Sequence, residues 1–348
     1  MKIFTAIVFC FLLSVQPIFA VGEQNDAEDS EIDIKETLFG HVGNDYEFHI
    51  AKIRGKDITL PLPVILYGKD KGLCIFMSSR FNHKSQSYKG FKIAEEGDCK
   101  GLAVEYADDG SELRPLDLSI TKNVFTIFIA CLLISLVFIG IGKKYKRKPL
   151  SAPSRLQSIM EPIILFIVDD VAKPVLGHSY KKYIHYLLTV FFTILTLNLI
   201  GLIPVFPFGG NVTGNINVTL ALALCTLILT MFGTTKNYWN HKLWTPGVPG
   251  WVKVSSLMPF VEVISIFTGP IALTIRLLAN ILSGHMIVIV MTSMIFIFYA
   301  YGPVVETPVT LVSLAFSLFI LMLDVLVAFV QAYVFTLLSA LYFAGAKH

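Results

Sequence analysis

The sequence has 348 residues, of which 54% are hydrophobic and only 15% are charged, and its formal net charge is +3. This composition excludes a soluble globular protein and is typical of a polytopic membrane protein. The basic excess is small and is concentrated around residues 143–148, where it favours a membrane-topology signal over a nucleic-acid site.

The first 20 residues have the composition of a secretory signal peptide. One lysine near the start precedes an apolar core, and the small residue Ala20 stands at its end. An uncleaved first membrane span is the alternative. With either interpretation, we expect the segment that follows to lie outside the cytoplasm.

Residues 21–120 differ from the rest of the chain because short apolar runs alternate with Gly, Lys and Asp. The sequence therefore predicts a small β-rich extracytoplasmic domain after an acidic start. The runs expected to form strands are 45–53, 57–67, 72–79 and 89–96. Cys74 and Cys99 could form a disulfide bond in an oxidising compartment. No metal site is expected, since His41 and His49 lack further ligands at suitable spacing.

Residues 121–348 are predicted to form an all-α, polytopic membrane domain. The apolar segments predicted to be embedded in the membrane are 123–142, 183–204, 217–233, 259–300 and 308–344. A shorter apolar part of 151–182, flanked by charges, fits a helix at the cytoplasmic membrane surface. As one helix, 259–300 would be about 60 Å long, twice the thickness of the hydrocarbon layer. It is therefore a hairpin or a single, steeply tilted helix.

The distribution of basic residues predicts the orientation of these segments. Nine Lys or Arg residues lie between 143 and 182, whereas 204–217 and 301–308 contain none. Because cytoplasmic loops carry the excess of Lys and Arg, we expect the N-terminal region outside and the C-terminus in the cytoplasm.

An arginine, Arg276, lies near the middle of the apolar segment 259–300. Arginine keeps its charge in proteins, and placing it at membrane depth costs from about 3 to more than 10 kcal/mol. Stepping by helical turns places Ala272, Ala279 and Ser283 on its face, with Asn280 beside them. Such small residues let another surface come close to the cation.

Further polar residues lie on this segment and on the last one. His285 falls on the opposite face from Arg276, whereas Glu262 falls roughly on the arginine's face. On the last segment, Asp324 and Gln331 are seven residues apart and share a face, which also contains Tyr342. A buried Asp–His pair between the two segments would lower the cost of burying each group. Ionisable residues at this depth are candidates for a functional site.

The two motifs together resemble those of a known family. RLLANILSGH at 276–285, followed by DVLVAFVQAYVFTLLSALYF at 324–343, resembles subunit a of F-type ATP synthases. The resemblance covers about residues 120–348 and includes several independent spacings. One departure is that many bacterial members have an acid at position 285 and a histidine at 324, whereas the two are exchanged here, as in mitochondrial relatives.

The resemblance implies a proton-translocating stator subunit with two half-channels. Protons would enter from outside, reach a carboxylate of the c-subunit ring, and leave on the cytoplasmic side near Glu262. Arg276 would separate the two paths. Asn280 and Tyr342 also fall at family positions. The residues that would line the outer half-channel are Asn198, Asn217, His285, Asp324 and Gln331.

The same resemblance implies the surroundings of the chain. The expected partners are the c-subunit ring, the b-subunit peripheral stalk, the rest of the ATP synthase complex and membrane lipid, in a bacterial inner membrane. The chain is expected to have no catalytic site, no cofactor and no nucleic-acid partner. The His–Asp pair favours H⁺ over Na⁺ without deciding between them. A secondary ion-coupled transporter is the main alternative, and a structural membrane scaffold is a second.

Overall fold

The computed structural model describes residues 46–53, 56–68, 72–81, 88, 90–94, 102–106, 112–147, 155–203, 212–233, 257–299 and 301–345. The predicted signal peptide and acidic segment lie outside these residues. The chain divides into two compact units, one formed mainly by residues up to Ile129 and one by most residues from Ala130 onward.

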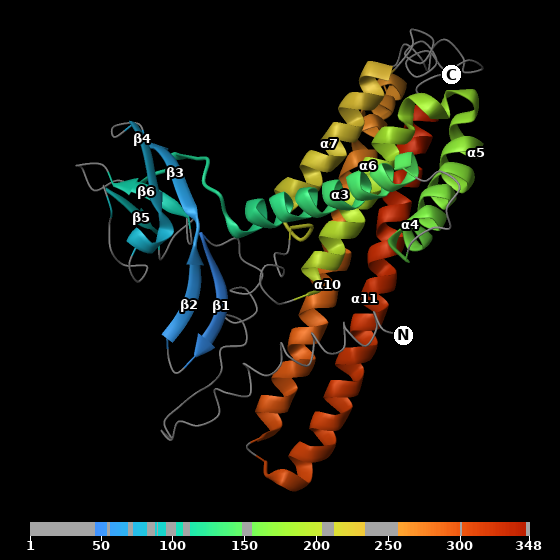
Figure 1. The fold of residues 1–348 in the computed structure, drawn as a ribbon. Coiled ribbons are helices and arrows are strands. Elements are labelled where there is room, and N and C mark those ends of the chain that lie inside the picture. Colours follow the sequence, from blue (N-terminus) through green and yellow to red (C-terminus); the bar gives the residue numbers. More distant parts are fainter. Residues whose placement is uncertain are drawn as a thin grey trace. The chain divides into compact units, whose positions relative to one another are not determined.

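The first unit is built from short antiparallel strands (Figure 1). The described strands are β1 (Glu47–Ile53), β2 (Lys56–Pro61), β3 (Pro63–Gly68), β4 (Gly72–Met77), β5 (Phe91–Ile93), β6 (Ala103–Tyr106), β7 (Glu112–Leu113) and β8 (Leu116–Asp117). They form the pair β1–β2 and two three-stranded sheets, with orders β4–β3–β8 and β5–β6–β7. Each of the four predicted runs overlaps a strand, and 57–67 is divided between β2 and β3, so the prediction of a β-rich region is confirmed.

The core of this unit follows the two-residue period of its strands. In β3, Val64 and Leu66 are fully buried, and Phe91 of β5 is buried with them. The Tyr46 hydroxyl donates a hydrogen bond to the Asp117 carboxylate and accepts one from the Ala103 N–H at 3.1 Å. Burial and the hydrogen bond to Asp117 raise the pKa of the Tyr46 phenol. These bonds connect the sheet of β8 with that of β6.

Two predictions about this unit stay untested. Cys74 is buried in β4, but Cys99 lies outside the described residues, so their disulfide bond remains a prediction. The same holds for the two histidines, because His41 and the side chain of His49 lie outside the described part of the chain.

The second unit is helical. Its elements, with α3 shared between the units, are α3 (Lys122–Arg147), α4 (Arg155–Phe166), the π-helical η2 (Ile167–Ala172), α5 (Lys173–Leu176), the 3₁₀ turn η3 (Gly177–Ser179), α6 (Tyr180–Gly201), α7 (Ile216–Gly233), α10 (Leu257–Tyr299) and α11 (Pro303–Gly345). The segment predicted as a hairpin or a tilted helix is thus the single helix α10. It continues through Pro270.

Helix α6 supplies most of the core of this unit. Leu187, Phe191 and Ile194 are fully buried. The rings of Phe191 and Phe329 form a T-shaped pair with centroids 5.7 Å apart, which packs α6 against α11. The segment predicted to lie at the membrane surface forms α4, η2 and α5, and its Ile167 belongs to the same core. Its place at a membrane surface remains a prediction.

Hydroxyl groups inside the helices are satisfied locally. Buried hydroxyls donate to the carbonyl four residues earlier at 2.8–3.2 Å, as in Thr126, Thr226, Thr230, Thr274, Thr336 and Ser339. This pairing removes the cost of burying an unpaired hydroxyl where no water is available.

The described helices are long and apolar enough for a polytopic membrane protein. Four segments could cross a membrane by length and composition, namely Lys122–Arg147, Arg155–Gly201, Phe267–Tyr299 and Val304–Gly345, and Ile216–Phe232 is a shorter apolar helix. Exposed leucines on α3, such as Leu132 and Leu136, form an outer surface suited to lipid. The predicted fold class is therefore confirmed.

Candidate functional site

The candidate site is formed by α10 and α11, which run antiparallel side by side along their length (Figure 1). A short turn at Gly302 joins them. Gly302 has φ +86°, a conformation that other residues rarely adopt, so glycine allows the chain to reverse here. The turn brings residues far apart in sequence to the same level of the pair.

Asn280 and Gln331 join the middle of the two helices. The Asn280 Nδ2 donates a hydrogen bond of 2.9 Å to Oε1 of Gln331, whose side chain is only 4% exposed. Hydrogen bonds between helices in membranes contribute about 0.5–2 kcal/mol each. This bond therefore both stabilises the pair and fixes its register.

Two glycines of α10 receive polar side chains from α11. A Cβ added to Gly284 would lie 2.6 Å from Oδ1 of Asp324, and a Cβ added to Gly269 would collide with the Tyr342 hydroxyl. The Asp324 carboxylate thus lies directly against the backbone of α10, one residue from His285. Asp324, Gln331 and Tyr342 all face α10, which confirms that they share one face.

Arg276 lies on an open face of α10. Ala272, Ala279 and Ser283 are exposed beside it, as the helical spacing predicts. Within the described part of the chain, the Arg276 guanidinium makes no hydrogen bond or ion pair. The arginine face is therefore open among the described residues, which do not include the side chain of Glu262.

The two candidate asparagines of the shorter helices differ in environment. Asn198 of α6 is 1% exposed, and neither Nδ2 nor Oδ1 has a hydrogen-bond partner among the described residues. Asn217 is exposed at the start of α7, where its N–H binds Oδ1 of Asn215 at 3.0 Å. A buried amide without partners normally binds water, so Asn198 marks a polar point inside the helical unit.

The structure leaves two predicted residues undecided. Glu262 and His285 belong to α10, but their side chains lie outside the described part of the structure. The Asp–His pair therefore remains a prediction. The Asp324 carboxylate does lie against Gly284, which directly precedes His285 in α10.

Sequence reasoning missed Gly269 and Gly284. Both are interior glycines of a long helix, where glycine is costly and often indicates close approach of another group. That signal marks the positions but does not say which residue of α11 approaches them.

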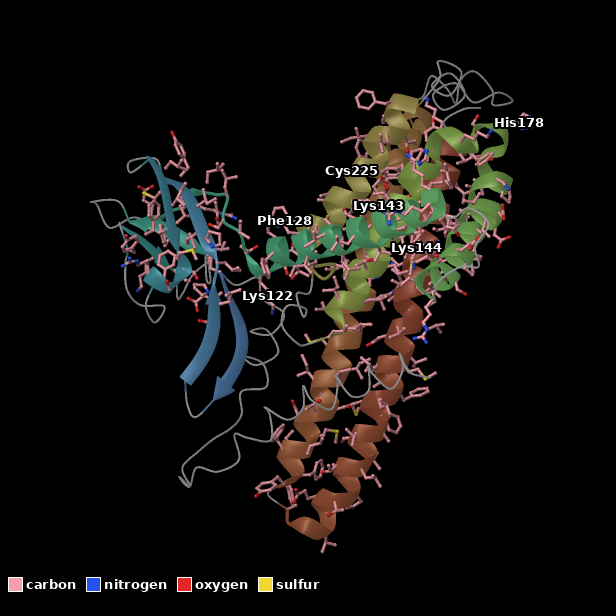
Figure 2. All side chains as sticks on the ribbon, in the orientation of Figure 1. Lys122, Phe128, Lys143, Lys144, His178 and Cys225 are labelled. Carbon is pink, nitrogen blue, oxygen red and sulfur yellow. The ribbon has the colours of Figure 1, made fainter. Side chains whose placement is uncertain are left out.

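A cluster of positive charge lies at the end of α3. Lys143, Lys144 and Lys146 are exposed there, and Figure 2 labels the first two, with Lys122 at the opposite end of the helix. Positive residues at one end of an apolar helix are the usual sign of its cytoplasmic side.

These features define a polytopic membrane protein with a lone arginine and a set of polar side chains on two long antiparallel helices. The family model described as ATP synthase A chain matches residues 124–344. A second family model, described as a domain of unknown function (DUF8433), matches residues 37–118.

Relatives in several bacteria support the first match. The chain is 39% identical over 241 residues to ATP synthase subunit a of Chloroherpeton thalassium, covering 68% of each chain. It is 42% identical over 237 residues to subunit a 2 of Chlorobaculum tepidum, covering 66% of this chain and 64% of the relative. It is 38% identical over 256 residues to subunit a of Myxococcus xanthus, covering 71% and 79%.

The chain therefore belongs to the ATP synthase subunit a family, the non-catalytic, proton-translocating stator subunit of the membrane sector.

Proposed function

We propose that α10 and α11 provide two proton half-channels that lead to the carboxylates of a c-subunit ring, and that Arg276 separates them. The open face around Arg276 carries this proposal, because its charge has no acidic partner among the described residues while small side chains surround it. A ring carboxylate passing this face would be favoured in its ionised form and would release its proton.

The outer half-channel would use the polar residues between the helices. Asp324 against Gly284 and the Asn280–Gln331 bond provide a polar path between α10 and α11. The unpaired amide of Asn198 supports hydration on this side, and His285, Gln331 and Asn217 would complete the lining. Protons would enter here from outside.

The inner half-channel would open near Glu262, on the same helix as Arg276. Tyr342, packed against Gly269, lies on the side of Arg276 toward Glu262 along α10 and supports a polar exit there. The fixed charge of Arg276 between the two paths would prevent protons from passing directly from one to the other.

The same proposal covers location and partners. The chain would lie in a bacterial inner membrane, with a signal peptide at 1–20, an extracytoplasmic region at 21–120, a membrane domain at 121–348 and a cytoplasmic C-terminus. The two family matches, which fall on either side of residue 120, support this division. Contacts with the c-subunit ring and the b-subunit peripheral stalk would hold it as a stator in the ATP synthase complex.

The decisive test is the variant Arg276→Ala in membrane vesicles. We expect ATP-driven acidification and proton-driven ATP synthesis to be lost, because the barrier between the half-channels is removed. Ser283→Ala, on the same exposed face, is the matched control and should pump normally. Normal pumping by Arg276→Ala would refute the proposal. If the chain purifies without a c ring or a catalytic head, the alternative function as a secondary ion-coupled transporter would be supported instead.

A further inference from the structure

The sheet β4–β3–β8 has apolar side chains on both of its faces. Those on the inner face, such as Val64, Leu66 and Phe76, form the core of the unit. The outward side chains are also apolar and are 48–61% exposed: Tyr67, Leu73, Ile75, Met77, Leu116 and Leu118. An antiparallel sheet with one face in water normally alternates between apolar and polar residues, so this outward face is unusual.

The register makes these side chains one continuous surface. Tyr67 of β3 pairs with Leu73 of β4 and with Leu116 of β8, while Ile65 pairs with Ile75. Leu118 follows on the same side and donates its N–H to the Ile65 carbonyl at 2.9 Å. None of these residues is charged. We call this surface the outer apolar face.

The outer apolar face is held close to the start of α3. After Leu118, the Ile120 N–H binds the Pro63 carbonyl at 3.0 Å, and α3 begins two residues later. The first turns of α3, up to Ile129, belong to the same compact unit as the sheet, and Asn123 and Thr126 are buried there. The sheet is thus fixed to the first turns of a membrane-spanning helix.

We propose that the outer apolar face lies on the lipid surface of the membrane that α3 spans. The strand that ends this face leads directly into that helix, on which the apolar side chain of Phe128 is exposed (Figure 2). A protein partner would be expected to meet polar groups that fix its orientation, whereas this face offers only apolar side chains and one amphipathic tyrosine. Tyrosine is favoured at the boundary between lipid and water.

The proposal assigns a role to the β-rich unit that is separate from ion translocation. The unit would contact the lipid surface through the outer apolar face and so fix the start of α3 at that surface. Burial of the face in lipid would remove apolar side chains from water without a protein interface.

Photochemical cross-linking of the purified complex in nanodiscs tests this proposal. Ile75 is replaced by a photoreactive diazirine amino acid, in a bilayer of phosphatidylethanolamine and phosphatidylglycerol. Ser79, which is exposed beyond the end of β4, is the matched control position. We expect lipid adducts, identified by mass spectrometry, at position 75 and no lipid adducts at position 79.

Two outcomes with the assembled complex overturn the proposal. Adducts from position 75 to a protein chain would mean that a partner covers the face, and adducts to water alone would mean that it is free in solvent. If the substitution at 75 prevents assembly, the same measurement at Leu73 and Leu116 decides, since both are exposed on the same face. The readout does not depend on proton translocation, so it is independent of the proposed half-channels.

Discussion

The Asp324 carboxylate lies against the backbone of Gly284, in a space that a single methyl group on that glycine would fill. The pair brings a titratable group of α11 next to the helix that contains Arg276 and His285. A small residue at 284 is thus a condition for the carboxylate to occupy this position.

We therefore expect Gly284→Ala to impair proton-driven ATP synthesis severely. The added methyl would push Asp324 away from α10, and overpacking of this kind costs about 1–3 kcal/mol. Gly140→Ala in α3, where an added Cβ meets nothing within 4 Å, is the matched control and should retain activity. Synthesis in vesicles measures the effect. Equal rates for Gly284→Ala and the unmodified protein would show that the close contact is unimportant.

The Asn280–Gln331 bond predicts coupling between two distant positions. Replacing either residue by Ala leaves the other amide without its partner, so the double variant should lose less stability than the sum of the single variants. We expect a coupling of about 0.5–2 kcal/mol in unfolding of the purified chain. Ser283→Ala combined with Gln331→Ala provides an uncoupled control. Strict additivity of Asn280→Ala and Gln331→Ala would contradict the bond.

The exchanged acid and histidine predict a partial rescue. Asp324→Ala or His285→Ala alone should slow proton delivery severely, because one group is lost and its partner is left buried and unpaired. The double exchange, His285→Asp with Asp324→His, restores an acid–imidazole pair at the same depth and should recover part of the activity. Proton-driven ATP synthesis compares the three proteins. An exchanged protein no better than the worse single variant would rule out a coupled relay.

The basic end of α3 predicts the orientation of the chain. We expect the N-terminal unit, with Cys74 and Cys99, outside the cytoplasm and the 143–182 segment inside. Membrane-impermeant thiol labelling of intact cells tests both sides, with Ser79→Cys and Lys144→Cys as exposed probes. Position 79 should react from outside, and position 144 only after the membrane is opened. The reverse pattern would overturn the orientation and, with it, the assignment of the two half-channels.

Helical spacing was sufficient to place Asp324, Gln331 and Tyr342 on one face, whereas the faces of Glu262 and His285 stay predictions. Asp324 and Gln331 are seven positions apart, close to two turns, and the contacts with α10 confirm that both face that helix. The partner that each residue meets was not predictable, because the register between two helices depends on the packing of their whole surfaces. For the same reason, Gly284 was overlooked as the neighbour of Asp324.

The least predictable elements are those that depend on tertiary pairing. Strands β7 and β8 contain two residues each, too few to show a period, and they form because β6 and β3 offer ladder partners. The sequence also left open whether 259–300 is a hairpin. It forms one helix because Pro270 is tolerated within it and only Gly302 provides the described reversal between α10 and α11.

The length of α11 determines how the membrane voltage acts along it. The apolar helix Val304–Gly345 has 42 residues. It is about 63 Å long against a hydrocarbon layer of about 30 Å, and a helix of this length that lies wholly within the layer tilts until each residue adds only about 0.7 Å of depth. Asp324 and Gln331 then differ in depth by about 5 Å, and 100 mV does only about 0.4 kcal/mol of work on a charge moved between them. In the proposed outer half-channel, proton movement along this face would thus be mainly parallel to the membrane, and local proton affinities, more than the voltage, would determine its direction.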